Sequence, residues 1–235
     1  MTELPKRRPT RVILGATCYA DAEAGIAVAV GLARVLSGEL QGLLVEEESI
    51  VAYAGLPFAR VIGPGGRAEG GLSAERMRAA FRRDARAFER RLAEAAGAAA
   101  LGWSFAARPG RLATVLGEIA GAGDFILLGH RAARPSEGEV VFLPAPDGDP
   151  ALGALAERLA GALGRPLRVL AGTAGAAAPV GAALERLPTR AAVMVRLARL
   201  SPAAVLAEAG AVAPGDVTDL AETARCPVIV QRPVS

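Results

Sequence analysis

The fold is decided by residues 11–45, which read RVILGATCYADAEAGIAVAVGLARVLSGELQGLLV. Arg11–Ala16 is a short apolar run, typical of a buried strand. Apolar residues then recur at helical spacing over residues 21–37, which predicts a helix that Gly38 ends. Leu40–Val45 is a second apolar run. A strand, a helix and a strand joined by short connections predict a right-handed βαβ unit with parallel strands.

The rest of the first half continues this alternation. After a long connection over residues 46–72, Ser73 is the N-cap of a predicted helix that runs to Ala96. Its apolar residues fall on one face, as in a helix that packs against a sheet. The remaining predicted elements are a strand at Trp103–Arg108, a helix at Gly110–Ala120, a strand at Asp124–Gly129 and a linker at 130–138.

The pattern then restarts with a period of about 128 residues, which indicates an internal duplication. The opening βαβ unit is copied as a strand at Glu139–Leu143, a helix from Asp149 to Leu163 that ends at Gly164, and a strand at Leu167–Ala171. We expect further elements as follows: a short helix around Val180–Leu187, a strand at Ala191–Leu197, helices at Pro202–Ala209 and Asp216–Ala224, and a strand from Cys226 to Val230. The long second helix has no counterpart here. The sequence therefore predicts domains at residues 1–137 and 138–235, the second truncated.

The composition excludes several classes of protein. Hydrophobic residues make up 52% of the 235 residues and charged residues 22%, which is typical of a globular chain. One His and two Cys are too few for a Cys/His zinc site or a disulfide framework, so we expect no metal. The net charge of +3 is small for a nucleic-acid-binding protein. The first apolar stretch is at the low end of the length that a signal peptide needs, and it is typical of a strand that enters a helix. No apolar run is long enough for a membrane span, so we expect a cytoplasmic protein.

The end of the chain resembles the universal stress protein family. Residues 220–230 read LAETARCPVIV, similar to that family's C-terminal helix, Cys-Pro-Val and apolar strand. Asp124–Gly129 resembles its fourth strand and the start of its nucleotide loop. The resemblance implies an α/β fold of two tandem Rossmann-like units with mainly parallel sheets, the second unit truncated. It also implies frequent dimers and, in some members, ATP binding.

The nucleotide motif of that family is incomplete in this chain. ATP-binding members carry Gly-x-x-Gly, nine residues and Gly-Ser or Gly-Thr after the fourth strand, so that backbone N–H groups approach the phosphates. If Gly129 is the first glycine, Ala132 and Phe142 occupy the other two glycine positions. The candidate cofactor-binding residues that remain are Thr17, Asp21, Gly129, His130, Asp147 and Gly148. We therefore expect no cofactor, with ATP as the ligand to test.

Two other patterns in the sequence have both a functional and a structural interpretation. Residues 63–68 read GPGGRA and match a dinucleotide fingerprint, but no strand directly precedes them and a loop is favoured. The helix over residues 73–96 carries seven Arg against four acidic residues. A solvated face explains this surplus, while an acidic partner surface is the functional alternative. No aromatic residues alternate with the arginines, so we expect no nucleic acid.

Three functions stay open. The first is a non-catalytic module for interaction or regulation with a degenerate ATP-binding motif, so not an enzyme. The second is a nucleotide-binding stress-response protein that uses an altered phosphate loop. The third is a small-molecule enzyme at the strand edge, with Cys18 as nucleophile and His130 as base. Cys226 is interpreted as a buried structural residue.

The truncated second half is expected to complete the first half. One face of its sheet lacks a helix, and an uncovered parallel sheet exposes apolar side chains to water. The first half, or a second copy of the chain related by two-fold symmetry, is the expected cover. The final strand, Val228–Val230, is the predicted seam. A homodimer or another protein partner is therefore expected.

Overall fold

The computed structural model describes residues 9–54, 60–62, 68–71, 73–130, 138–172, 181–212 and 217–233. The first half contains β1 (Arg11–Ala16), α1 (Tyr19–Leu36), β2 (Glu39–Glu47), α2 (Glu48–Ala54), β3 (Arg60–Ile62), β4 (Ala68–Gly71), α3 (Ala74–Ala98), β5 (Trp103–Gly110), α4 (Leu112–Ile119) and β6 (Phe125–Leu128). The second half contains β7 (Val140–Leu143), α5 (Pro150–Leu163), β8 (Leu167–Ala171), β9 (Ala183–Arg186), α6 (Arg190–Arg199), β10 (Ala204–Ala207), α7 (Val217–Ala224) and β11 (Val228–Gln231).

Nine strands form one sheet in the order β5-β2-β1-β6-β11-β10-β7-β8-β9. The neighbours within each half are parallel. The pair at the centre is antiparallel: β11 pairs with β6, and Ile229 lies opposite Leu127. The mainly parallel α/β fold is confirmed, and the final strand is the seam, as predicted. The internal duplication and the domain limits stay predictions.

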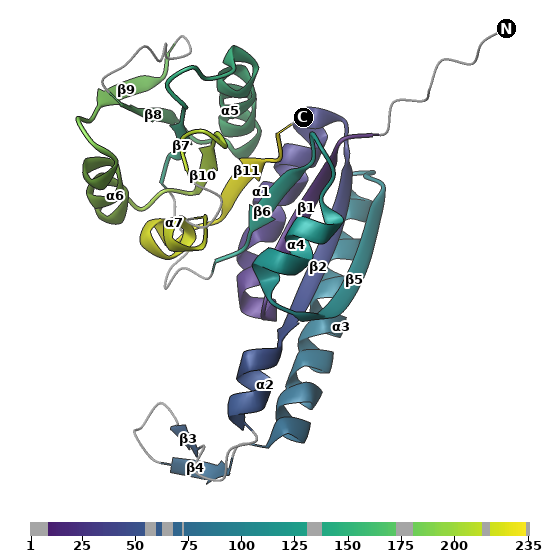
Figure 1. Ribbon diagram of the computed structural model, residues 1–235. Helices are drawn as coiled ribbons and strands as arrows, with labels where there is room; N and C mark the ends of the chain where they lie inside the picture. Colours follow the sequence, from purple (N-terminus) through teal and green to yellow (C-terminus); the bar gives the residue numbers. More distant parts are fainter. Residues whose placement is uncertain are drawn as a thin grey trace, which may run out of the picture.

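Helices cover both faces of the sheet (Figure 1). On one face, α1 packs between α3 and α5 over a core that spans both halves, with Leu14, Phe88 and Leu159 fully buried. On the other face, α4 covers a core of the first half, and α6 and α7 cover a core of the second half. The sheet is therefore the middle layer of three, and α1 joins the two halves on one side.

Two of the helix ends that the sequence predicted are present. Ser73 caps α3 by accepting a hydrogen bond from the N–H of Arg76, and Gly164 ends α5 at a φ of 64°. Asp149, predicted as the first residue of the next helix, is the N-cap of α5 and accepts from the N–H of Ala151. At the end of α1, however, Ser37 adopts the left-handed conformation, and not Gly38. Gly38 is required for another reason, since a Cβ there would collide with the carbonyl oxygen of Thr10.

Three predictions in the second half are wrong. The expected helix around Val180–Leu187 contains strand β9, the expected strand at Ala191–Leu197 is helix α6, and the expected helix at Pro202–Ala209 contains strand β10. The side chain of Thr189 caps α6 by accepting from the N–H of Ala192 at 3.1 Å. All four residues of β10 are buried, because a central parallel strand is covered on both faces and its apolar run shows no alternation.

The long connection at residues 46–72 contains α2, β3 and β4. Figure 1 shows α2 and the first half of α3 projecting from the body, with β3 and β4 at the tip. Most of the fingerprint at residues 63–68 lies outside the described residues. Ala68 begins β4, which pairs with β3 in an antiparallel hairpin, so this segment does not connect a strand to a helix as a dinucleotide fingerprint requires.

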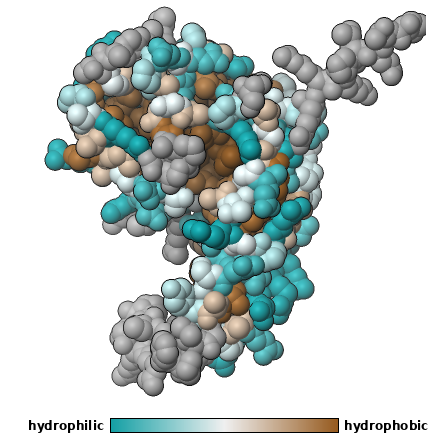
Figure 2. Space-filling model, in the orientation of Figure 1, coloured by the Kyte–Doolittle hydropathy of each residue, from teal (hydrophilic) through white to brown (hydrophobic). Residues whose placement is uncertain are grey.

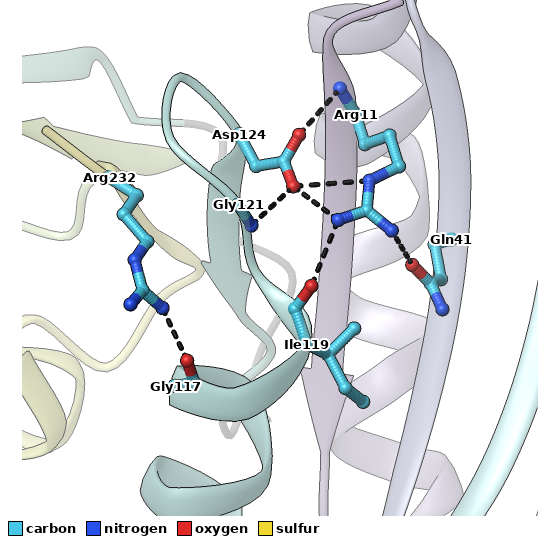
Figure 3. Close-up of polar contacts among 7 residues, drawn as sticks. All are labelled: Arg11, Gln41, Gly117, Ile119, Gly121, Asp124 and Arg232. Atoms are coloured by element: carbon cyan, nitrogen blue, oxygen red, sulfur yellow. Dashed lines mark hydrogen bonds and ion pairs between the residues drawn. The ribbon is translucent and has the colours of Figure 1, made fainter. Parts of the chain in front are cut away.

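A buried ion pair ties the first strand to the loop before β6 (Figure 3). Arg11 donates from Nε to Oδ2 of Asp124 at 3.1 Å and also from a terminal nitrogen, and Gly121 N donates to the same carboxylate at 2.8 Å. The Asp124 side chain is 4% exposed. Burial works to raise the pKa of Asp124, but the hydrogen bonds from Arg11 and Gly121 and the Arg11 charge outweigh it and lower the pKa.

We expect Asp124→Asn to lower the free energy of unfolding by about 3 kcal/mol at neutral pH, because it leaves the Arg11 charge without its partner. The depressed pKa means that this contribution is present above the unfolded value, 3.8, and is lost as the pH falls through the folded pKa. Urea unfolding at a series of pH values should therefore show the difference from wild type shrinking in acid.

The matched control is Glu94→Gln, which removes an exposed carboxylate 3.4 Å from Arg91. An exposed ion pair contributes about 0.5 kcal/mol or less. A loss from Asp124→Asn that is no larger than the loss from this control would contradict a structural role for the buried pair.

Candidate functional site

The antiparallel seam places the candidate residues at two opposite edges of the sheet. Because β11 runs antiparallel to β6 and parallel to β10, the carboxyl ends of the strands in the two halves point in opposite directions. The group formed by Thr17, Asp21, Gly129 and His130 follows β1 and β6, while Asp147 and Gly148 follow β7. The structure therefore does not bring the six predicted residues into one site.

At the first edge, Gly129 closes the end of β6 against α1. Its N–H donates to the carbonyl of Gly15 at 3.0 Å, and a Cβ at this position would collide with the carbonyl oxygen of Asp21. The glycine is thus explained by a close approach of two backbones. Ala132 lies outside the described residues, and Phe142 is a buried residue of β7, where no loop glycine is needed.

The N-terminus of α1 is occupied by a carboxylate from another helix. Asp84 of α3 accepts a hydrogen bond from the backbone N–H of Tyr19 at 2.9 Å, across 65 residues of sequence. The first N–H groups of a helix carry partial positive charge and are an anion site in many nucleotide-binding proteins. In the sequence, Asp84 is only one of the four acidic residues of the arginine-rich helix, and no local pattern indicates this contact.

The N-terminus of α4 at the same edge has a similar partner. Glu47, at the end of β2, accepts from the N–H of Leu112 at 2.9 Å. A hollow of about 550 Å³ lies beside the ends of β2 and β5, and its lining includes Glu46, Glu48 and Arg78. Its two carboxylates disfavour a phosphate group at this place.

The second edge is organised by Glu208, directly after β10. Glu208 corresponds to Gly129, because its N–H donates to Leu143 at the end of β7 just as Gly129 donates to Gly15 at the end of β1. Its Oε2 accepts from the N–H of Ala145 at 2.5 Å. A Cβ on Gly148 would collide with the same oxygen, so that glycine lets the loop before α5 wrap the carboxylate.

Glu208 is a buried acid in which only one of the two carboxylate oxygens has a hydrogen-bond partner among the described residues. It is 3% exposed, and its Oε1 has no hydrogen-bond partner among the described residues. Burial raises the pKa of Glu208, and the nearby charge of Asp149 adds to the shift, against the backbone N–H groups of Ala145 and Asp149. The sequence analysis placed this residue in a helix and did not single it out, although an acid directly after an apolar run was the available signal.

A hollow of about 310 Å³ opens at this second edge. Its lining is mainly apolar and includes Leu143, Pro144, Pro146, Leu170 and Leu187. Thr189 and Arg190, at the N-terminus of α6, supply its polar side. Ligands of open α/β sheets bind outside the carboxyl ends of the strands, which makes this hollow a candidate small-molecule site. Asp147 is exposed and is not among its lining residues.

Cys18 is in an environment that holds its thiol protonated. Its Sγ donates to Oδ2 of Asp21 at 3.1 Å. Burial is the main cause that raises the pKa of Cys18, and the hydrogen bond and negative charge of Asp21 raise it further, while backbone N–H groups oppose the shift. A nucleophilic cysteine needs a lowered pKa, so this environment opposes that role. Cys226 is 1% exposed, and burial raises its pKa to about 12.

Within the described part of the chain, no three His, Cys, Asp or Glu side chains are grouped so that they could hold a metal ion. None of the described helices is both long and apolar enough to cross a bilayer.

The comparisons with known proteins concern the fold. No family model and no curated protein matches this chain. It is similar to a universal stress protein from Archaeoglobus fulgidus DSM 4304 with 12% identity and a TM-score of 0.46, over 94% of this chain and 96% of that chain. It is also similar to a protein assigned to the universal stress proteins from Pseudomonas aeruginosa UCBPP-PA14, with 13% identity and a TM-score of 0.48, over 96% of this chain and 94% of that chain. A third similar structure is a protein of unknown function from Pseudomonas aeruginosa PAO1, with 12% identity and a TM-score of 0.48, over 96% of this chain and 93% of that chain.

The strand order and the alternation of strands and helices agree with the Rossmann-like architecture that the sequence resemblance implies.

We expect Glu208→Gln to stabilise the protein at neutral pH. The raised folded pKa means that the protonated acid is favoured in the fold, so stability is lost as the pH rises from the ordinary value, 4.5, through the folded pKa. The neutral amide removes that loss, so the variant should gain about 1 kcal/mol or more at neutral pH and little in acid. Urea unfolding against pH measures this. Glu157→Gln, an exposed site on α5, is the control, and a gain that did not depend on pH would contradict the prediction.

We expect Asp21→Asn to speed alkylation of Cys18 by iodoacetamide severalfold at pH 8. In the wild type the midpoint of the pH profile should lie above 9.0, and the variant should lower it, because a carboxylate that accepts from the thiol and repels the thiolate is gone. Mass spectrometry of the Cys18 peptide measures the rate. Glu23→Gln, on the same helix, should leave the profile unchanged. A wild-type midpoint below that of a free cysteine would instead favour the nucleophile hypothesis.

Proposed function

We propose that this chain is a non-catalytic interaction or regulatory module with a universal-stress-protein-like fold and a degenerate nucleotide site. The single observation that carries the proposal is the placement of the chain's own carboxylates where a nucleotide phosphate would need N–H groups. Asp84 accepts from the N-terminus of α1, Glu47 from that of α4, and Glu208 from Ala145 in the loop before α5.

The electrostatic cost of a phosphate at these places is large. Two like charges about 4 Å apart in a partly buried site repel by roughly 4 kcal/mol. The N–H groups of Tyr19, Leu112 and Ala145 already donate to carboxylates, so a phosphate would have to displace them as well as tolerate their charge. Repulsion of this size is equal to the whole binding energy of a ligand with a dissociation constant of about 1 mM.

The arginine-rich helix supports an interaction role. All seven Arg residues of α3 are exposed, and they are Arg76, Arg78, Arg82, Arg83, Arg86, Arg90 and Arg91. Of its four acidic residues, Asp84 turns inward to α1, which leaves the outer surface more positive than the sequence count alone indicates. Partners with acidic surfaces fit this helix, and a homodimer remains part of the proposal. The cytoplasm is the proposed location.

One observation favours the alternative of a nucleotide-binding stress-response protein. The hollow of about 310 Å³ at the second edge is at the lower end of the range for small-molecule sites and has Arg190 in its lining. The enzyme alternative has weaker support, since Cys18 has a raised pKa.

Calorimetry with ATP should detect no binding tighter than about 1 mM for the wild type. Asp84→Asn combined with Glu208→Gln removes two of the repelling charges and should strengthen ATP binding by at least about tenfold. Glu89→Gln combined with Glu157→Gln removes two exposed carboxylates elsewhere and should have no effect. Micromolar binding by the wild type would overturn the proposal and support the nucleotide-binding alternative.

A further inference from the structure

An apolar hollow lies over the seam between the two halves. It has a volume of about 460 Å³ and is bounded by α4 on one side and α7 on the other, with β6 and β11 as its floor. Figure 2 shows brown side chains gathered in a depression at this place. Leu116, Leu128 and Val212 are the buried part of its lining, and Ile126 and Val230 are half-buried.

The shared strand explains why the hollow exists. In the second half, α7 follows β10 and packs beside β11. In the first half, the described residues provide no helix between β6 and β7. The two halves therefore share one strand, β11, and one helix, α7, at the seam. Among the described residues, the face of β6 between α4 and α7 is only partly covered. The lining is apolar because the side chains on the face of a parallel sheet normally pack beneath a covering helix.

Polar groups are concentrated at one end of the hollow. Arg232, which follows β11, belongs to the lining, next to Gln231, and Thr218 of α7 adds a hydroxyl group. The guanidinium of Arg232 donates one hydrogen bond to the carbonyl of Gly117 near the end of α4 (Figure 3). A guanidinium carries five N–H donors in a planar fork that suits a carboxylate, so this contact leaves donors that can bind a ligand.

We propose that this hollow is a binding site for a small amphipathic monoanion, with a hydrocarbon part over β6 and β11 and a carboxylate at Arg232. The volume is that of a small-molecule site, and such sites combine an apolar lining with a few polar groups that orient the ligand. The apolar part accounts for most of the affinity and the guanidinium selects the charge. This hollow shares no lining residue with the hollows at the two edges of the sheet.

The test uses two probes that differ in charge. Calorimetry of the full chain with dodecanoate and with its uncharged counterpart dodecanol separates the contribution of the carboxylate from that of the hydrocarbon. We expect the wild type to bind dodecanoate about tenfold more tightly than dodecanol, as a charge-assisted hydrogen bond to Arg232 implies. Arg232→Gln should remove this preference and leave dodecanol binding within about twofold, while Arg232→Lys should restore part of it. Arg199→Gln, an exposed position on α6, is the control for charge.

A second variant tests the place of the ligand. Gly117 of α4 lines the hollow, and a Cβ there would meet no atom within 4 Å, so the side chain of Gly117→Leu has room to enter the hollow. It should weaken both probes at least about tenfold. Gly161→Leu is the matched control, because Gly161 lies in helix α5 with equally open space and is outside the hollow. Both substitutions replace a helical glycine and are expected to preserve the fold.

Three outcomes would overturn the proposal. The first is equal affinity for dodecanoate and dodecanol in the wild type, and the second is no effect of Gly117→Leu on either probe. The third is a dimer, detected by analytical ultracentrifugation, that Gly117→Leu dissociates while the wild type binds neither probe; it would assign the hollow to a second copy of the chain.

Discussion

The antiparallel pairing of β11 with β6 is the interaction on which the rest of the structure depends. β11 is also the parallel neighbour of β10, so both of its edges are hydrogen-bonded inside one chain. Neither half then leaves an apolar strand edge at the middle of the sheet, where it would promote aggregation. The same pairing reverses the direction of the strands between the halves and sends their carboxyl ends to opposite edges.

The carboxylates at the strand ends follow from that arrangement. Long-range side chains supply partners for N–H groups at both edges. Asp84 and Glu47 accept from helix N-termini at the first edge, and Glu208 accepts from the loop before α5 at the second. An internal partner fixes these loops in the way that a bound anion would. Glu208 does so at a cost, since a buried oxygen without a partner destabilises by about 1–3 kcal/mol. The loops are therefore held without any ligand.

Apart from α2, β3 and β4, which lie in the predicted connection, the sequence predicted the elements up to residue 171. Local signals mark them: the caps Ser73, Asp149 and Gly164, and apolar runs of the right length. Between residues 180 and 209 the predicted helices contain strands and the predicted strand is a helix. The reason is that alanine-rich segments show little contrast between the periods of a helix and a strand. The candidate site was predicted less well. Its six residues divide between two edges, and the reversal at the seam depends on long-range pairing that no local pattern contains. The partners of Tyr19 and Ala145 are long-range for the same reason.

The position of the apolar hollow follows from the sharing of β11 and α7. Strand pairing satisfies the hydrogen-bonding groups at the edges of a sheet, but it does not cover the apolar faces. Helices must cover those faces. Here β11 completes the edge of β6, but α7 packs on the second half and α4 on the first, which leaves Ile126 and Val230 half-buried between them. At the strand ends, where open α/β sheets bind ligands, the chain's own carboxylates accept from helix and loop N–H groups. The hollow over the seam shares no lining residue with the hollows at those ends, and Arg232 supplies the charge that orients a ligand there.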